Sequence, residues 1–187
     1  MPLVEQDLKF AASRYTPVAI VLHWLLALMI LGALGFGLYM TDLPFSPARI
    51  RQYNWHKWAG ITILALSALR LLWRLTHPAP KLPLSTPLWQ QKSSHAAHGL
   101  LYVLFFAIPL AGWAYSSAAG FTVVYFGVLP LPDWVPKDPE LAKTLKFIHM
   151  ALGKALIVLI LVHIAAALKH QFIDRDSLLR RMMPKSR

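Results

Sequence analysis

The sequence predicts an all-α fold, an integral membrane bundle of four antiparallel helices, with residues 1–187 forming a single membrane domain. Three observations lead to this prediction. Of the 187 residues, 57% are hydrophobic and only 14% are charged, and the mean hydropathy is +0.49. Apolar runs long enough to cross a bilayer recur four times. The 19 Lys and Arg residues, against 8 Asp and Glu, lie mainly between and after those runs, as topogenic charges do.

The same composition excludes several classes of protein. The apolar content excludes an intrinsically disordered chain. Nucleic-acid binding is excluded because it needs basic side chains massed along one face, whereas here they are separated by long apolar runs. The absence of cysteine excludes disulfides, iron–sulfur clusters, thiolate metal sites and thioether-linked haem.

The first helix is expected at about 15–41, because no charged residue occurs between Arg14 and Asp42. A span needs roughly 20 apolar residues, and this run is long enough to cross with some tilt. Pro17 falls in the first turn, where a helix tolerates proline. Acidic residues in the preceding segment and the length of the run argue against a cleaved signal peptide.

The other three helices are expected at about 54–75, 95–119 and 144–172. Pro109 predicts a kink in the third helix, which neighbouring helices must accommodate. Lys154 interrupts the fourth helix near one end, where its aliphatic stem can extend toward the membrane interface. The chain therefore crosses a lipid bilayer four times.

Four crossings place both termini on the same side of the membrane. Twelve Lys and Arg residues lie on that side and six on the other, which predicts that both termini are cytoplasmic. The basic tail 173–187 is then a topogenic and lipid-attracting segment without a catalytic role. The apolar, proline-rich loop 120–143 is expected to lie against the outer membrane surface with Trp134 at the interface, a partner-binding surface being the alternative. The cytoplasmic set is Lys9, Arg14, Arg70, Arg74, Lys81, Lys92, Lys169, Arg175, Arg180, Arg181, Lys185 and Arg187.

Eight histidines in a chain with so few polar residues are the main functional signal, since titratable side chains are costly in a bilayer. His149 and His163 are 14 residues apart, which is about 21 Å along a helix and about 40° short of four full turns. They therefore share one face, one near the outer end and one near the inner end. His56 opens the second helix at the outer depth and His23 opens the first at the inner depth. Depth thus pairs His56 with His149 and His23 with His163.

Two facing imidazoles without a cysteine or carboxylate at the same level suit the axial positions of b-type haem iron. Zinc would need further ligands that the interior does not offer. The alternative is structural hydrogen bonding between helices. Gly60 and Gly153, four residues after the outer histidines, would leave room for a flat macrocycle, although small residues also favour ordinary helix packing.

The third helix opens with two further histidines, His95 and His98, at the inner depth. They compete with His23 as the partner of His163, and spacing alone does not decide between them. His98 is a candidate for hydrogen bonding a haem propionate or for lining the second cofactor surface, with a structural role as the alternative. His77 precedes a proline in a loop and is expected to be solvated.

From about residue 15 to the tail, the chain resembles the bacterial di-haem cytochrome b561 family. The order and spacing of the motifs carry this resemblance more than any single motif does. The motifs are Ile20-Val21-Leu22-His23-Trp24, Trp55-His56-Lys57, Arg70-Leu71-Leu72-Trp73-Arg74-Leu75, His95-Ala96-Ala97-His98-Gly99, Ala165-Ala166-Ala167-Leu168-Lys169-His170 and Ser177-Leu178-Leu179-Arg180-Arg181-Met182-Met183-Pro184.

The resemblance implies two b haems in a four-helix bundle, with axial ligands His56 and His149 outside and His23 and His163 inside. Within the family, the chain resembles the stand-alone form, and this resemblance implies a superoxide oxidase of the bacterial inner membrane. Superoxide would give electrons at the periplasmic side and ubiquinone would accept them at the cytoplasmic side, with a histidine matching His170 at the quinone site. The matching segment of this chain is Lys169-His170-Gln171, whereas the stand-alone form of the family has two adjacent histidines at this place.

Several cations are candidates for contacting the redox partners. Arg70 and Arg74 lie one turn apart at the inner end and are candidates for holding propionates or quinone oxygens, with topogenic anchoring as the alternative. Lys81 and Lys169 are weaker candidates for the quinone surface. A ring of outer cations would steer anionic superoxide, or is simply solvated helix-end charge. The ring consists of Arg49, Arg51, Lys57, Lys143 and Lys146.

Three functional hypotheses remain open from the sequence. The first is an enzyme, a superoxide:ubiquinone oxidoreductase that needs no protein partner and in which two haems accumulate the two electrons that quinone requires. The second is a cytochrome b subunit linking the quinone pool to a separate dehydrogenase or hydrogenase, as in the broader superfamily. The third is a non-redox bundle with structural histidines, or a metal transporter.

Overall fold

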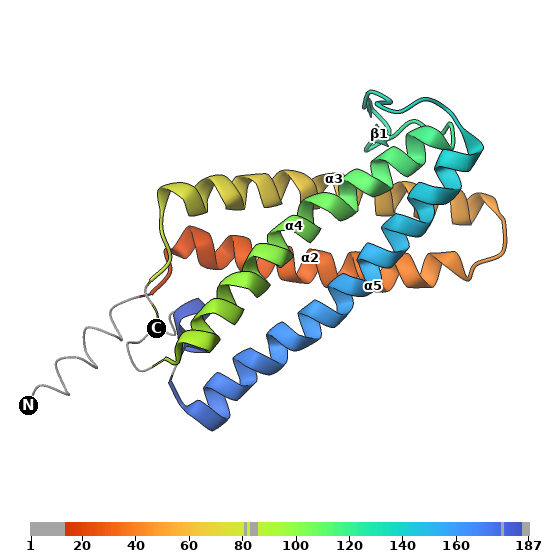
Figure 1. Cartoon of the computed structure of the whole chain (residues 1–187). Helices are drawn as coiled ribbons and strands as arrows, with labels where there is room; N and C mark the ends of the chain where they lie inside the picture. The colour runs from red at the N-terminus through yellow and green to blue at the C-terminus, as the bar shows by residue number, and fades with distance from the viewer. Residues whose placement is uncertain (1–13, 81, 83–85, 177, 185–187) are drawn as a thin grey trace, which may run out of the picture.

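The computed structural model describes residues 14–80, 82, 86–176 and 178–184, and shows four long helices lying side by side (Figure 1). In chain order they are α2 (Pro17–Thr41), α3 (Pro47–Thr76), α4 (Leu88–Ala118) and α5 (Pro139–Lys169). All four are long and apolar enough to cross a membrane. The predicted membrane four-helix bundle is therefore confirmed. Of the residues discussed above, Lys9, Lys81, Ser177, Lys185 and Arg187 lie outside the described part of the chain.

Three of the helices begin earlier than predicted, at residues 47, 88 and 139 rather than at about 54, 95 and 144. Polar and charged first turns hid these starts, because the helices continue past the apolar run. Local caps set two of them. The Ser46 hydroxyl accepts from the Arg49 N–H at 3.2 Å, and the Asp138 carboxylate accepts from Glu140 and Leu141 at 2.8 and 3.1 Å. A proline follows each cap at the first helical position, where its missing N–H costs nothing.

The core of the bundle lies at mid-height, where apolar side chains from all four helices meet. Leu26 is fully buried. The other buried members of this cluster are Ile30, Ile63, Leu101, Leu104 and Leu156. Most remaining apolar side chains face outward, and only 6% of the most apolar window of the fourth span is buried inside the protein. Such an exposed apolar exterior is unsuited to water and fits a lipid bilayer.

The outer loop folds into a small cap on the ends of the helices. It contains β1 (Val124–Tyr125) and β2 (Leu129–Pro130), which pair antiparallel with Val124 opposite Pro130. The Trp58 indole N–H donates to the Val124 carbonyl at 2.7 Å, and the hydroxyls of Thr62 and Tyr125 are 2.8 Å apart. The loop is thus anchored to α3, and its contact with the membrane surface stays a prediction.

Two details of the cap refine the expected interfacial role of this loop. Trp134 remains 53% exposed, although its ring meets that of Trp113 edge-on at 6.3 Å. The Thr122 hydroxyl donates to the Asp133 carboxylate at 2.6 Å, and this bond holds the pKa of Asp133 below its ordinary value. The cap therefore presents both an ordered polar turn and apolar side chains at the outer end of the bundle.

The inner end closes with a tail segment that returns to the start of α2 (Figure 1). After Lys169 the backbone forms one π-helical turn, η1 (His170–Asp174), instead of the α-helix expected to reach about residue 172. A 3-10 turn follows, η2 (Leu179–Met182). Its backbone meets α2, since the Trp24 indole N–H donates to the Met182 carbonyl at 2.8 Å. Part of the segment predicted as a topogenic tail is therefore folded structure.

Candidate cofactor-binding site

The outer histidine pair faces an apolar cavity between the helices. The ring centroids of His56 on α3 and His149 on α5 are 6.1 Å apart, and their planes are perpendicular. A metal held about 2 Å from each imidazole nitrogen, with roughly 1 Å more to each ring centre, needs centroids roughly 6 Å apart. The cavity is also lined by Gly60 and Gly153. The structure therefore brings together the outer pair predicted from depth, at a separation suited to bis-imidazole ligation.

The hydrogen bond of His149 fixes which of its nitrogens is free. Its Nδ1 lies 2.9 Å from the Ile108 carbonyl of α4. A carbonyl only accepts hydrogen bonds, so Nδ1 carries the proton and the Nε2 lone pair is left for a metal. A bond of this kind is the usual outer support of a metal-bound imidazole. The buried Nδ1 of His56 has no hydrogen-bond partner among the described residues.

Two glycines that the sequence analysis missed seat these rings. A Cβ atom on Gly37 would lie 3.0 Å from Cε1 of His56, and one on Gly112 would lie 2.9 Å from Cε1 of His149. By contrast, a Cβ on Gly60 or Gly153 would meet nothing within 4 Å. Gly37 and Gly112 thus admit the imidazoles, whereas Gly60 and Gly153 leave the cavity open. The sequence offered one signal for Gly37 and Gly112, because both lie level with the outer histidines on the two remaining helices, α2 and α4.

The inner pair, His23 and His163, has a similar separation but a third ring nearby. The centroids of His23 on α2 and His163 on α5 are 6.4 Å apart at 64°. His98 lies closer to His163, at 5.4 Å and 83°, and its Nδ1 is bonded to the Ser94 carbonyl at 2.7 Å. The His23 separation matches the spacing for a metal held between two imidazoles better than the His98 separation does. His23 also leaves a buried Nδ1 without a partner in the described structure.

The other inner candidates lie around this pair. Arg70 interacts electrostatically with His23, His98 and His163, and its guanidinium lies 5.7 Å from the Tyr102 ring centre. One buried guanidinium nitrogen of Arg74 has no hydrogen-bond partner among the described residues. Arg74 also interacts electrostatically with His98, so both arginines lie near the inner histidines, where an anionic group could meet them.

Two inner histidines are bound to their own helices. His95 is exposed, with Nδ1 2.7 Å from the Gln91 carbonyl, and the structure gives it no contact with His163. His77 is also exposed, as predicted, but it stacks on Trp73 with centroids 3.9 Å apart. These contacts place both at the ends of helices rather than between them.

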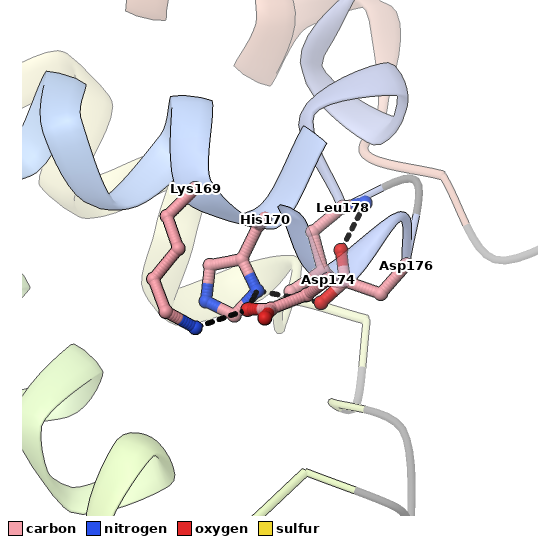
Figure 2. Close-up of polar contacts among 5 residues, drawn as sticks. All are labelled: Lys169, His170, Asp174, Asp176 and Leu178. Carbon is pink, nitrogen blue, oxygen red and sulfur yellow. Dashed lines mark hydrogen bonds and ion pairs between the residues drawn. The ribbon is translucent and has the colours of Figure 1, made fainter. Parts of the chain in front are cut away.

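His170 lies in a polar cluster that the sequence analysis did not anticipate (Figure 2). Its Nδ1 is 2.5 Å from the Asp176 carboxylate and 3.3 Å from that of Asp174. Lys169 pairs with Asp174 at 2.5 Å. The two aspartates come close only because the chain turns back after α5, which no periodic pattern announces.

The outer cations do not form a uniform ring. Arg49 donates to the Tyr53 hydroxyl at 3.3 Å, Lys57 reaches the Phe121 carbonyl at 3.5 Å, and Lys143 pairs with Glu140 at 2.6 Å. Lys143 and Lys146 also line a small surface pocket together with Lys137. Lys137 was absent from the predicted ring. Arg51 lies 5.9 Å from the Trp55 ring centre.

Comparison with known proteins gives consistent matches over nearly the whole chain. Residues 14–185 match the family described as prokaryotic cytochrome b561. The chain is 33% identical over 176 residues to "Cytochrome b561 homolog 2" of Escherichia coli K12, covering 93% of each chain. It is 32% identical over 181 residues to "Probable superoxide oxidase CybB" of Yersinia pestis, covering 94% of this chain and 98% of that one. "Cytochrome b561 homolog 1" of Escherichia coli K12 is 30% identical over 176 residues, covering 92% of this chain and 98% of that one.

Proposed function

This chain belongs to the prokaryotic cytochrome b561 family of haem-binding membrane electron-transfer proteins, and we propose that it oxidises superoxide and reduces ubiquinone through two b haems. The observation that carries the proposal is the pair of facing histidine sites at opposite depths, with ring separations of 6.1 and 6.4 Å. Haem, when bound, supplies one-electron redox chemistry. Superoxide is favoured as the donor by the name of the Yersinia pestis relative.

Under this proposal His56 and His149 would hold the outer haem, and His23 and His163 would hold the inner one. The Ile108 carbonyl fixes His149 in the ligating tautomer at 2.9 Å, and Gly37 and Gly112 admit the outer rings. His98, close to His163 but outside the axial pair, is left to contact a propionate or line the inner site, with Arg70 and Arg74 as the cations beside it.

The reaction balances with two donors per quinone. Two superoxide anions lose one electron each and become dioxygen, while ubiquinone takes both electrons and two protons and becomes ubiquinol. A protein that joins these half-reactions must keep the first electron until the second arrives, so two one-electron sites in one chain match the stoichiometry. Protons are needed only at the quinone end, where His170 is available as a proton relay.

The outer surface suits an anionic donor in part. Lys137, Lys143 and Lys146 share one pocket, and clustered cations raise the local concentration of a small anion. Arg49, Lys57 and Arg51 contact Tyr53, Phe121 and Trp55, and Lys143 is paired with Glu140 at 2.6 Å. We therefore assign superoxide attraction to this lysine pocket chiefly through Lys146 and through Lys137, which the predicted ring did not include. The arrangement requires the outer end to face the periplasm, with the termini in the cytoplasm and the protein in the inner membrane.

A second candidate function is an electron-transfer subunit that receives electrons from a separate dehydrogenase. The apolar tip of the outer cap favours it, since Val128 is 81% exposed and Phe126 is 60% exposed. An exposed apolar patch on an ordered turn is suited to docking a partner protein. The same patch is equally suited to the membrane interface. The enzyme hypothesis therefore accounts for it without a partner protein.

Superoxide and ubiquinone together distinguish these functions. We expect purified, haem-loaded protein in lipid nanodiscs to reduce a short-chain ubiquinone when superoxide is generated enzymatically, with ubiquinol followed by absorbance. Superoxide dismutase should abolish the reaction and catalase should not. A rate no higher than the spontaneous reaction would exclude the oxidase function. If haem reduction then required an added dehydrogenase, the subunit function would be supported instead.

Replacing Gly112 with Ala should displace the outer axial ligand. The new Cβ would lie 2.9 Å from Cε1 of His149, a contact that forces the imidazole or α4 to move. We expect the G112A protein to lose about half of its haem or to show a shifted outer-haem potential, since loss of support for a metal ligand typically costs 10–100-fold in affinity. Potentiometric titration of the visible spectrum measures both.

Gly35→Ala is the matched control, because a Cβ at Gly35 would meet nothing within 4 Å. It should keep both the haem content and the potentials of the wild type. Equal behaviour of the two variants would show that Gly112 does not seat the ligand.

A further inference from the structure

We infer that Asp176 is a positioning residue for His170, holding its Nδ1–H so that Nε2 is free to exchange a proton with the quinone. This inference rests on the proposed function, in which quinone is reduced near the cytoplasmic end of α5. His170 lies seven residues after His163, which is about 10.5 Å along a helix and about 20° from the same face. It therefore continues the row of His149 and His163 toward the cytoplasm.

The carboxylate of Asp176 is held from two sides (Figure 2). One oxygen lies 2.5 Å from Nδ1 of His170. The other accepts the backbone N–H of Leu178 at 3.1 Å. Because a deprotonated carboxylate only accepts hydrogen bonds, Nδ1 of His170 carries the proton and the tautomer is fixed. A carboxylate in this position both orients the ring and stabilises the imidazolium that forms when Nε2 takes up a proton.

The backbone brings Asp176 back to His170 through an unusual turn. The turn η1 is π-helical, a form that occurs mostly as single turns and often at functional sites. Arg175, directly after it, has a φ of 54° in the left-handed region, which costs free energy for a residue with a side chain. The Asp176 N–H then donates to the His170 carbonyl at 3.3 Å. This turn places a residue six positions later against the imidazole.

A strap formed by residues 178–184 keeps the turn in place. Tyr15 N–H donates to the Arg181 carbonyl at 3.4 Å, and an Arg14 guanidinium nitrogen donates to the Met183 carbonyl. The Arg181 side chain is only 5% exposed. Burial lowers the pKa of its guanidinium, while Tyr15 and Asp176 act in the opposite direction. The strap thus links Asp176 to the start of α2, the helix that carries His23.

The charges around His170 favour a proton relay over a cation site. The groups around it are Lys169, Asp174 and Asp176, with Arg181 interacting with Asp176 from the strap. Ligand atoms of His170, Asp174 and Asp176 all lie within 4.8 Å of one another, a spacing that a divalent cation could also bridge. However, Lys169 already neutralises Asp174 at 2.5 Å. Of its two carboxylate neighbours, Nδ1 of His170 lies closer to Asp176, at 2.5 Å against 3.3 Å to Asp174, so Asp176 is its hydrogen-bond acceptor.

The step that Asp176 supports is a proton transfer with a closed balance. Protonated Nε2 of His170 donates its proton to a quinone oxygen as the quinone receives electrons. The imidazole, now neutral, keeps its Nδ1–H on Asp176 and takes a new proton at Nε2 from the cytoplasm. Without the carboxylate, the neutral ring can carry its hydrogen on either nitrogen, and only one of these forms accepts the next proton at Nε2.

Asp176→Asn tests the charge and the tautomer while keeping the shape. Its amide can still accept the Leu178 N–H, so the strap is retained, but it presents an N–H to Nδ1 of His170. Starting from dithionite-reduced protein mixed with ubiquinone-1, we expect reoxidation of the haem absorbance to slow about 10–100-fold, up to but not beyond the lower limit of typical general acid–base effects. The ubiquinone concentration for half-maximal rate should stay unchanged. The solvent deuterium isotope effect should rise.

Three comparisons sharpen the test. Asp176→Glu restores a carboxylate and should recover part of the rate. Asp42→Asn, which removes an exposed carboxylate at the opposite end of α2, should have no effect. Imidazole ¹⁵N NMR, with the His170 signal assigned by its loss in His170→Gln, should show Nδ1 protonated in the wild type and not in D176N.

The possible failures are distinguishable. If the wild type is reoxidised by ubiquinone-1 and D176N matches it in rate and in NMR tautomer, the positioning role is wrong. If D176E is as slow as D176N, the carboxylate acts through structure alone and the inference also falls. If reduced wild type is not reoxidised by quinone, this inference and the proposed acceptor fail together. If quinone reoxidation is normal but superoxide does not reduce the protein, only the proposed donor is wrong.

Discussion

His149→Ala is expected to remove one haem and leave the other. Among the described histidines, His149 faces His56 at 6.1 Å between ring centroids, whereas His23 and His163 face each other at 6.4 Å, about 21 Å away along α5. Without the His149 imidazole, His56 alone would be left to hold the outer haem. Pyridine haemochrome analysis should therefore give half of the wild-type haem per chain, with the inner potential retained in a redox titration.

The reciprocal and control variants make this result specific. His56→Ala should reproduce the H149A spectrum, and His163→Ala should lose the inner haem instead. His98→Ala is the control at the inner depth, since its ring lies 5.4 Å from His163 and outside the axial pair. It should keep two haems. If each axial replacement removed both haems, or neither, or if H98A lost the inner one, the assignment of ligands would be wrong.

The histidine pairs could be predicted because helix geometry is rigid. A separation of 14 residues fixes both the height and the face of His149 and His163, whatever surrounds them. Antiparallel crossing then fixes which end of each neighbouring helix lies at the same level. Helix geometry does not depend on side-chain packing, and the rings it pairs lie 6.1 and 6.4 Å apart. That these pairs hold haem stays a prediction. Helix geometry left His98 open, because the three rings at the inner level differ only in distances that sequence spacing does not set.

The parts that escaped prediction depend on local geometry without periodicity. Helix starts such as Pro47 lie outside the apolar run, where hydropathy gives no signal and only the preceding cap residue does. Gly112 seats a histidine from another helix, so no spacing along one helix reveals it. Asp176 meets His170 only through a π turn and a left-handed residue, Arg175. In each case a contact between elements, rather than a pattern within one, determines the site.

His170→Gln should abolish quinone reduction while leaving haem reduction by superoxide intact. Glutamine keeps a polar side chain of comparable reach but does not take up and release a proton near neutral pH. Loss of a general acid typically costs 10²–10⁴ in rate, so we expect ubiquinol formation to fall by at least about 100-fold. Stopped-flow absorbance separates the two half-reactions, since superoxide reduces the oxidised protein and ubiquinone reoxidises the reduced one.

Comparison with Asp176→Asn tests whether His170 and Asp176 act together. The two residues share one hydrogen bond of 2.5 Å, so their effects should not add: H170Q/D176N should be no slower than H170Q alone, as for residues acting as one unit. His95→Gln is the matched control, because His95 is an exposed inner histidine whose Nδ1 is hydrogen-bonded to the Gln91 carbonyl of its own helix. If H170Q reduced quinone at the wild-type rate, proton delivery would have to come from another group. If the double variant were slower by the product of both effects, His170 and Asp176 would act separately rather than through the bond between them.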